Sequence, residues 1–595
     1  MTNVKQLITE HLDIWLTAET EKKSGRGRSS GSSDTIYGVQ KLRELIVNLA
    51  LTGKLVEHIP CDISVAEVIK KIEEDKKQLI KEGKIKKTNK KYIQSESDTE
   101  IPFGWELTII NNLIFDMDAG WSPACLSEPA NDNQWGVLKT TAVQSNYFLA
   151  FENKALPESL SPKKEYEVQA GDILVTRAGP YNRVGIACYV ENVRPNLMIS
   201  DKLIRLKYNS NYINGKFFAL SINFGPTCIY LKENQSGMAE SQVNISQDKL
   251  RSALILIPPL EEQQRIVEKV DELMQLCDQL EQQQTLSSDA HATLVDTLLK
   301  ALTESNDAEE FQANWQRIVA NFDLLFSTEY SIEQLKQTIL QLAVMGKLVK
   351  QDPSDESVAT LLKRIEKNKN ERVKNKEIQK PKSIIVDDSL QFDAPETWKK
   401  VLLNDIAFVT KLAGFEYTKY MKLEDSGQVP VIRAQNVKPF ELNESSLKYI
   451  DLETSKKLQR CALDRDALLM TFIGAGIGDV CIFNKKQRYH LAPNVAKIEP
   501  FADTDLKYLL IFLNSPIGRD EIFKSLKATA QPSISMTTIR EIWLPLPSLD
   551  EQRRIVEKVN QLYSMIEQLQ TLQSKLQKTK LHLADALMAN AVEGV

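Results

Sequence analysis

The sequence predicts an α+β protein in which two mixed α/β globular domains are separated by long antiparallel coiled-coil helices and related by a pseudo-twofold internal duplication. An eleven-residue phrase that begins at Leu260 (LEEQQRIVEKV) returns at Leu549 (LDEQRRIVEKV) with nine identities. A second phrase, residues 42–56, matches residues 335–349 with eight identities in fifteen. A period near 290 residues is too long for a solenoid. It therefore indicates two domain-sized modules, each with its own helical connector.

Bulk composition excludes several classes of protein. Hydrophobic content of 42% and charged content of 26% are ordinary for a globular chain. The net charge of −5 disfavours a polycationic binder but leaves room for local basic patches. The seven cysteines never form a C-x-x-C pair, which predicts a reducing cytoplasm and no disulfide or zinc framework. The sequence contains no run of eighteen apolar residues, so no membrane span is predicted. The first residues lack the apolar core of a signal peptide.

The N-terminal region, expected to cover residues 1–97, is predicted to be helical. A short amphipathic helix comes first, and residues 24–33 (SGRGRSSGSS) have the composition of a flexible linker. A second helix is expected to start at Val39 and to stop at Gly53, a residue type common at helix C-termini. A lysine-rich helix is expected over residues 64–92.

Two globular domains are expected at residues 98–257 and 391–547. Short apolar strand patterns there are separated by Gly, Pro, Asn and Ser, as in mixed α/β domains. Anchors recur in both: Trp105 matches Trp398, and the strand end before Lys139 matches that before Arg433. Between these anchors the two domains share little sequence. This pattern predicts two different ligands of one chemical type.

Each globular segment ends at a proline boundary, beyond which a long helix is predicted. The central helical region is expected at 258–390 and the C-terminal helix at 548–595. Apolar residues at coiled-coil spacing run through the second copy, whereas the first copy keeps the spacing to Leu280 and then turns polar. Either the two repeated helices pair with each other, or each half forms its own helical hairpin. The predicted seam consists of Ile266, Val270, Leu273, Leu280, Ile555, Val559, Leu562, Ile566, Leu569, Leu576, Leu583 and Leu587.

No catalytic constellation is found in the sequence. Gly53-Lys54 and its copy are followed by leucine, so neither is a nucleotide-binding P-loop. No methyltransferase motif of the Asn-Pro-Pro-aromatic type occurs, and the glycines at 474–478 predict a loop between strands. The five histidines lack ligand spacing, and for His490 a structural role is favoured over ligand contact. The chain is therefore predicted to bind and assemble, without catalysing a reaction itself and without a metal.

Strand ends in both domains carry side chains of the types that read base edges. Arg, Lys, Asn and Gln make bidentate contacts to purines in the major groove. A solvated surface charge is the plain alternative for each residue, but the duplicated frame favours a functional role for Lys139 and Arg433. The candidate DNA-binding residues are Lys139, Thr140, Thr141, Arg177, Tyr181, Arg183, Arg433, Gln435, Asn436, Lys485, Lys486 and Arg488.

Lysine-rich helices at 70–91 and 363–382 also correspond to each other in the two copies. Interleaved glutamates favour a solvated helix face, whereas the lysines alone would suit a track for phosphates. Both interpretations remain open from the sequence.

The chain carries a variable domain, a Glu-Gln-x-Arg-Ile-Val helix, a Gly-Lys-Leu-Val segment, a second variable domain and a second Glu-Gln-x-Arg-Ile-Val helix. This order resembles the specificity subunits of Type I restriction–modification systems. The resemblance covers residues 36–595, and the N-terminal region looks like the Type IB branch. It implies target-recognition domains that each read one half of a bipartite, asymmetric double-stranded DNA site. It also implies helices that set the spacer between the two halves.

The same resemblance implies partners and cofactors. Two modification (methyltransferase) subunits would dock on the helices, and two restriction (translocase and endonuclease) subunits would complete the complex in a bacterial or archaeal cytoplasm. This chain would bind no cofactor, because S-adenosylmethionine, ATP and Mg²⁺ would act on the other subunits. Two alternatives are considered. The first is a coiled-coil adaptor that presents two protein-binding domains, and the second is a self-contained enzyme.

Overall fold

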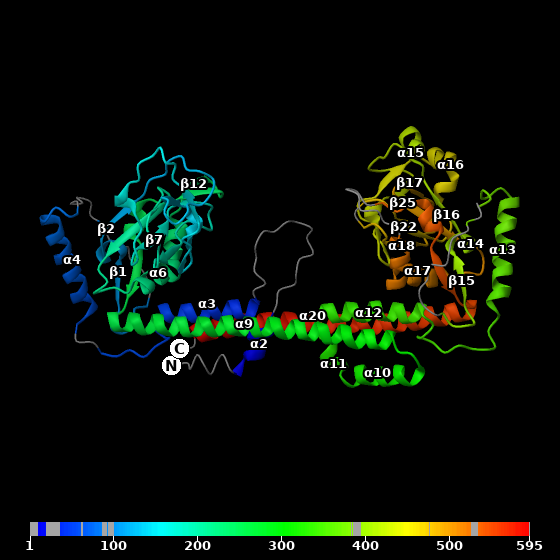
Figure 1. Ribbon diagram of the computed structural model, residues 1–595, viewed down its shortest axis with the longest axis horizontal. Helices are drawn as coiled ribbons and strands as arrows, with labels where there is room; N and C mark the ends of the chain where they lie inside the picture. The colour runs from blue at the N-terminus through cyan, green and yellow to red at the C-terminus, as the bar shows by residue number, and fades with distance from the viewer. Residues whose placement is uncertain are drawn as a thin grey trace. The chain divides into compact units, whose positions relative to one another are not determined.

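The computed structural model describes residues 10–18, 36–60, 63–85, 92, 100–381, 384, 394–474, 476–524 and 533–593. The chain divides into two compact units, residues 1–286 with 576–595 and residues 287–575. Each unit holds one sheet-containing domain and parts of two long helices, α9 (Leu260–Thr303) and α20 (Leu549–Glu593) (Figure 1). The α+β class is confirmed. The linker expected at 24–33 lies outside the described residues.

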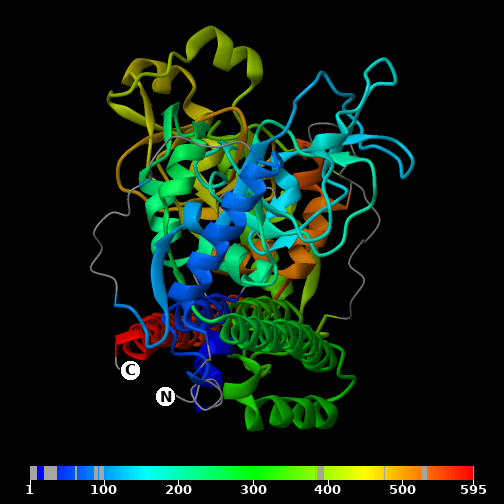
Figure 2. The ribbon, with the colours of Figure 1, turned by 90° about the vertical axis from the view of Figure 1, so that its left-hand side faces the viewer.

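The helical layer of the first unit is held together by α3 (Tyr37–Leu51), which contacts both long helices. Arg43 of α3 forms ion pairs with Asp278 and Glu281 of α9 at 2.6 and 2.9 Å. The Tyr37 hydroxyl donates a hydrogen bond to Asp585 of α20 at 2.7 Å. The domain stands on one side of this layer (Figures 1 and 2). The other helices of the region are α2 (Leu12–Thr17), α3 (Tyr37–Leu51) and α4 (Val65–Lys81).

The second unit repeats this plan with α12 (Glu329–Val344) in the place of α3. Tyr330 of α12 donates a hydrogen bond to Asp296 of α9 at 2.7 Å, and Lys336 donates one to Gln570 of α20 at 3.0 Å. In both units α9 and α20 are therefore continuous helices that share an apolar core with a third helix, not members of separate hairpins. The other helices of the region are α10 (Ala308–Ala320), α11 (Phe322–Leu325), α12 (Glu329–Val344) and α13 (Val358–Lys374).

The seam of α20 departs from the predicted spacing in its C-terminal part. Ile555, Val559 and Ile566 are buried, but Leu576 and Leu583 are 56% and 43% exposed. A straight α-helix drifts by about 20° per heptad from an exact 3.5-residue repeat, which is nearly one residue over four heptads. The buried side chain after the drift is Ala584, one position beyond the predicted Leu583. Leu562, Leu569 and Leu587 are half-buried, and the first-copy seam residues Ile266, Val270, Leu273 and Leu280 are buried.

The Gly-Lys-Leu-Val segments are helix ends that meet the globular domains. Gly53 and Gly346 follow α3 and α12 with φ of +70° and +72°. The next amide closes a Schellman bond in each copy, Lys54 to the Leu49 carbonyl at 2.9 Å and Lys347 to the Leu342 carbonyl at 3.0 Å. A Cβ on Gly346 would lie 2.4 Å from Pro395 Cγ. Glycine is therefore required here both for backbone conformation and for space.

The first domain is built from several small sheets. Its strands are β1 (Glu106–Ile109), β2 (Ile114–Ala119), β3 (Gly136–Leu138), β4 (Val143–Gln144), β5 (Tyr147–Phe148), β6 (Asn153–Ala155), β7 (Ile173–Thr176), β8 (Ala178–Gly179), β9 (Ala187–Tyr189), β10 (Leu197–Met198), β11 (Leu203–Tyr208), β12 (Ser236–Ala239), β13 (Gln242–Asn244) and β14 (Leu254–Ile257). They form an antiparallel sheet β2-β11-β7-β9, a sheet β10-β3-β6 in which β10 and β3 are parallel, and a sheet β12-β13-β8. Strands β1 and β14 pair antiparallel and close the domain where it joins the helices.

The second domain follows the same frame. Its strands are β15 (Lys399–Leu402), β16 (Ala407–Lys411), β17 (Val429–Ile432), β18 (Val437–Lys438), β19 (Glu441–Leu442), β20 (Lys448–Ile450), β21 (Ala462–Leu463), β22 (Ala467–Thr471), β23 (Val480–Phe483), β24 (Tyr489–Leu491), β25 (Val495–Pro500) and β26 (Trp543–Leu546). The antiparallel sheet β16-β25-β22-β23 corresponds to β2-β11-β7-β9, and the parallel pair β17·β24 corresponds to β3·β10. Gly474, Gly476 and Gly478 lie between antiparallel β22 and β23, as predicted.

Short helices complete the two domains. The first contains α5 (Ile110–Leu113), α6 (Gly215–Asn223), α7 (Gly225–Glu233), α8 (Gln247–Ser252) and the 3₁₀ turns η1 (Thr140–Ala142) and η2 (Lys164–Tyr166). The second contains α14 (Leu403–Ile406), α15 (Gly414–Tyr420), α16 (Leu452–Lys457), α17 (Leu506–Asn514), α18 (Pro516–Phe523), α19 (Met536–Arg540) and the 3₁₀ turns η3 (Ala434–Asn436) and η4 (Gln459–Cys461).

The lysine-rich helices α4 and α13 pack against the domains by their apolar faces. One lysine of each is structural. Lys76 donates to the carbonyls of Asn111 and Ile114 at 3.3 and 3.0 Å, and burial lowers its pKa. Lys369 donates in the same way to the carbonyl of Asn404 at 3.2 Å. The predicted helices were too long, since α4 ends at Lys81 and α13 at Lys374.

Candidate nucleic-acid interface

A buried glutamate of the repeated phrase fixes each domain to its long helix. The Trp105 indole donates a hydrogen bond to the Glu262 carboxylate at 2.8 Å, and Trp398 donates one to Glu551 at 3.0 Å. Both glutamates are at most 2% exposed. Each buried carboxylate therefore has an indole N–H as its donor. A charged group in a buried place needs such a partner, so the contact fixes the position of the glutamate relative to the tryptophan.

The glutamine that follows this glutamate joins three segments in each copy. The Gln263 amide donates to the Pro258 carbonyl at 2.8 Å and accepts from the Asn214 backbone N–H at 2.8 Å. Gln552 makes the same pair of contacts, to the Pro547 carbonyl and from the Asp505 N–H, at 3.1 and 2.9 Å. Asn214 and Asp505 are in turn the N-caps of α6 and α17. The glutamine therefore fixes the N-terminus of α6 (Gly215–Asn223) in the first domain and of α17 (Leu506–Asn514) in the second.

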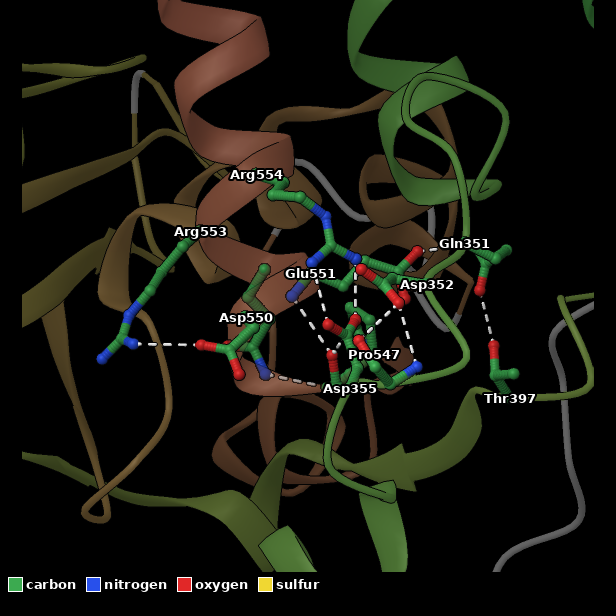
Figure 3. A network of polar contacts seen from close by, with 12 residues as sticks. Gln351, Asp352, Asp355, Thr397, Pro547, Asp550, Glu551, Arg553 and Arg554 are labelled. Atoms are coloured by element: carbon green, nitrogen blue, oxygen red, sulfur yellow. Dashed lines mark hydrogen bonds and ion pairs between the residues drawn. The ribbon is translucent and has the colours of Figure 1, made fainter.

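The two attachments differ in the second residue that contacts the glutamate. In the first unit the His58 ring nitrogen Nδ1 lies 2.9 Å from Glu262. In the second, Gln351 donates to Glu551 at 2.5 Å (Figure 3). Burial raises the pKa of Glu551, although these donors oppose the rise.

An ion pair adjoins the attachment in the second unit. Arg554 makes two hydrogen bonds to the carboxylate of Asp355, at 2.9 and 2.7 Å, and this pair holds the pKa of Asp355 below its ordinary value (Figure 3). Ser548 donates a further hydrogen bond to Asp355 at 2.9 Å. The loop before α13 is thereby tied to the first turns of α20.

The strand ends singled out in the sequence occupy equivalent places in the two domains. Lys139 follows β3 and caps η1, and Arg433 follows β17 and caps η3. In each case the strand belongs to the parallel pair of its sheet. The Lys139 ammonium lies 3.5 Å from Glu152, which also accepts a hydrogen bond from Thr141 at 2.5 Å.

We call the strand end at Lys139 the first corner and the strand end at Arg433 the second corner. Two of the candidates at the second corner, Arg433 and Asn436, make hydrogen bonds within the loop that follows β17. Asn436 is 1% exposed, and its amide donates to the carbonyls of Asn443 and Ser445 at 2.8 and 3.1 Å. Its side-chain oxygen accepts the Arg433 N–H at 3.0 Å. The Arg433 guanidinium donates to the Ser446 carbonyl at 2.6 Å. The structure therefore places Asn436 inside the loop, and only Arg433 and Gln435 reach its surface.

Arg183 is a clamp in the first domain. Its guanidinium donates to the carbonyls of Thr140 and Val143 at 2.8 and 2.7 Å and to the Gln144 side chain at 2.9 Å. Burial lowers its pKa. These bonds hold η1 against the loop after β8, so the guanidinium is committed within the domain.

The basic cluster after β23 is largely paired. Arg488 donates to the Ser455 hydroxyl and carbonyl at 2.8 and 3.0 Å and also contacts Asp464. Lys485 forms an ion pair with Glu444. His490 is fully buried and its ring faces the Leu458 and Leu491 carbonyls, so its role is structural, as favoured from the sequence.

Five candidates keep side chains that contact no other described group by hydrogen bond or ion pair. Tyr181 is 47% exposed, and Gln435 and Lys486 are also exposed. Arg177 lies at the C-terminal end of β7 with only its backbone bonded, to Lys202 and Ile245. These side chains are available to a ligand, and they comprise Thr140, Arg177, Tyr181, Gln435 and Lys486.

Sequence reasoning missed the anchoring roles of Glu262, Gln263, His58 and Arg554. For Glu262, Gln263 and Arg554 the signal was the identity of the repeated phrase, because polar residues that stay identical between diverged copies serve the frame that both copies share. His58 lies outside that phrase and the second copy has Gln351 in its place, so no repeated residue indicates its role. Among the described residues no group of three or more His, Cys, Asp or Glu side chains could hold a metal ion. In the described part of the chain no helix is long and apolar enough to cross a membrane.

Comparison with known proteins places this architecture among described families. The model of the Type I restriction modification DNA specificity domain matches residues 122–287 and 395–578. The chain is 33% identical over 602 residues to the Type I restriction enzyme EcoAI specificity subunit of Escherichia coli, covering 99% of this chain and all of that protein. Identity to the EcoEI specificity subunit of Escherichia coli is also 33%, over 98% of this chain and 99% of that protein. The crystal structure of the HsdS subunit from Thermoanaerobacter tengcongensis aligns over 84% of this chain and 98% of that chain, with 15% identity and a TM-score of 0.39.

Proposed function

Because this chain belongs to the family of Type I restriction–modification DNA specificity subunits, we propose that each of its domains reads one half of a bipartite DNA site. The observation that carries the proposal is the repeated strand-end corner. Lys139 and Arg433 hold equivalent positions after a parallel strand, while the neighbouring exposed side chains differ. The two domains thus share one backbone arrangement but expose different side chains. This is the pattern expected if both bind DNA and each recognises a different base sequence.

The long helices supply the assembly surface in this proposal. We propose that α9 and α20 set the spacer between the half-sites and dock two modification subunits, and that two restriction subunits join in the bacterial or archaeal cytoplasm. S-adenosylmethionine, ATP and Mg²⁺ would be bound by those subunits. The family match gives no support to the alternative of a protein-binding adaptor.

The test is a binding selection with the complete complex. The full chain, co-purified with its modification subunits, would be offered a randomised double-stranded DNA library, and the bound fraction sequenced. We expect enrichment of two short sequences separated by a spacer of fixed length. A bound fraction without sequence preference would contradict the proposal. Exchange of residues 98–257 for those of a relative should change one enriched half only.

A further inference from the structure

The first domain carries a polar ribbon that the candidate site does not explain. Strands β12 and β13 form an antiparallel hairpin, and β13 pairs in addition with β8. In Figure 1 β12 lies on the side of the domain opposite α4. Along β13, Gln242 and Asn244 are exposed and Val243 between them is 8% exposed. Alternate residues of a strand point to opposite faces, so the two amides share the outer face.

The ribbon is held firmly at its base. Val243 packs in the core of the domain. The Tyr181 N–H donates to the Glu240 carbonyl at 2.8 Å, and the Ile245 N–H donates to the Arg177 carbonyl at 2.9 Å. The Gln235 amide donates to the carbonyls of Tyr181 and Val184 at 3.2 and 3.1 Å. The exposed amides are therefore presented from a braced support, which lowers the entropy lost when a ligand binds.

A bulge shapes the outer strand. The pairing shifts between Ser236 and Ala239. A Cβ on Gly237 would lie 2.4 Å from the Gln242 carbonyl oxygen, so the two backbones approach closely only because this residue is glycine. Bulges increase the local twist and re-aim neighbouring side chains. This one adjoins Gln242.

The chemistry of the ribbon matches a base edge better than a phosphate. The Gln242 side-chain amide makes no hydrogen bond with any described residue. The Asn244 side-chain oxygen accepts one from Ser236 at 3.1 Å, which leaves the Asn244 amide N–H groups to donate. Glu240 at the turn is exposed and acidic, which disfavours a phosphate track. Two-stranded ribbons fit the major groove, where Gln and Asn recognise adenine by paired donor and acceptor contacts. Side chains two residues apart on a strand are about 6.6 Å apart, close to two base-pair steps of about 3.4 Å.

We propose that the β12–β13 ribbon enters the major groove of the half-site read by the first domain, and that Gln242 is a specificity-determining residue that contacts an adenine. Asn244 addresses the neighbouring bases on the same face. This inference rests on the proposed function and assigns residues to it. In this proposal Arg177 and Tyr181, which flank the base of the ribbon, contact the adjoining DNA backbone.

The test uses the full chain with its modification subunits and a randomised double-stranded DNA library. Gln242→Ala should lower the preference for adenine at one position of one half-site by about tenfold to hundredfold and leave the other half unchanged. Gln242→Glu, which replaces the amide by an acceptor, should shift that position towards cytosine. Gln169→Ala is the matched control and should behave as the wild type. Gln169 is an exposed glutamine that precedes β7, whereas the ribbon pairs with β8, which follows β7.

The outcomes separate this inference from the proposed function. A wild-type complex without sequence preference would contradict the proposed function itself. A selective wild type whose two Gln242 variants keep the same preferences would overturn the ribbon assignment alone. Equal weakening at every position by both variants, with unchanged thermal unfolding, would show a phosphate contact and would also overturn it.

Discussion

The Trp398 indole donates a hydrogen bond to the buried Glu551 carboxylate at 3.0 Å, and Trp105 donates the same bond to Glu262 at 2.8 Å. The tryptophan enters each domain ahead of its first strand, and the glutamate belongs to the long helix that leaves it. One contact thus joins the entry and exit segments of each domain. Aromatic packing supports it, with Trp398 and Tyr508 ring centroids 6.4 Å apart and nearly perpendicular.

Removal of this donor should destabilise the second unit. Trp398→Phe keeps most of the ring but leaves the Glu551 carboxylate with one partner fewer in a buried place. We expect a loss of about 1–3 kcal/mol in the free energy of unfolding of that unit. Calorimetry of the full chain measures it, and Trp315→Phe, at a 37% exposed tryptophan of α10, is the control. Equal effects of the two substitutions would contradict an anchoring role.

The Arg554–Asp355 pair should make the stability of the second unit depend on pH. Its hydrogen bonds lower the pKa of Asp355, so the contribution is present above the unfolded-state pKa of about 3.9 and is lost as pH falls through the lower folded-state pKa. Asp355→Asn should therefore cost about 1–2 kcal/mol at pH 7. The difference between wild type and variant should shrink below about pH 4. Urea unfolding at several pH values checks this, and a difference that is constant down to pH 3 would contradict it.

The repeated identities were a reliable guide wherever the two copies share a structural task. Gly53 ends its helix as predicted because a left-handed residue against Pro102 leaves room only for glycine. The predicted seam went out of phase at Leu576, because a heptad count assumes supercoiling that the straight helix lacks. A pattern of apolar residues alone does not reveal whether a helix keeps about 3.5 residues per turn, as in a supercoil, or about 3.6, as in a straight helix.

Arginine and asparagine were harder to assign than glycine. Arg183 and Arg177 have the same local signature, yet Arg183 clamps carbonyls some forty residues earlier in the chain. Asn436 is buried in its own loop although Gln435 beside it is exposed. Their partners are backbone groups brought together by the fold, and backbone groups carry no sequence signal. The surface role of a polar residue therefore required the tertiary structure.

The two arginines of the first domain should respond differently to substitution. Arg183→Ala removes the guanidinium that donates to the Thr140 and Val143 carbonyls, although the Thr140 carbonyl keeps the Val143 N–H, and should lower the stability of the domain by about 1–3 kcal/mol. Arg177→Ala should leave thermal unfolding unchanged but weaken DNA binding and reduce the dependence of log Kd on log salt by about one. Binding titrations at several salt concentrations, paired with thermal melts, distinguish the two. The prediction fails if Arg177→Ala unfolds the domain or leaves the salt dependence as it was.

At the second corner, Arg433 and Asn436 give a similar contrast. Asn436→Ala removes two donors to loop carbonyls and should destabilise the corner by about 1–3 kcal/mol. Arg433→Ala should weaken binding to the specific site by about 1–3 kcal/mol if the guanidinium contacts a guanine. Binding to specific and random duplexes at one salt concentration measures the effect. Equal loss on both duplexes would indicate a phosphate contact in place of base recognition.

The long helices allow a test of the proposed spacer. The middle of α9 around Gln283 is exposed, and so is the corresponding Leu572 of α20, so insertions there leave the apolar cores of both units intact. Four residues inserted after each position add about 6 Å of helix at about 1.5 Å per residue and nearly preserve helical phase. That length is close to two base pairs of about 3.4 Å rise. We therefore expect the complex to select a spacer about two base pairs longer, with both half-site sequences unchanged, in the same library selection. Alanine substitutions of Gln283 and Leu572 without insertion serve as the control and should keep the original spacer. If the spacer stays the same while the selected bases change, the helices do not set the distance, and the proposed division of labour between helices and domains is wrong.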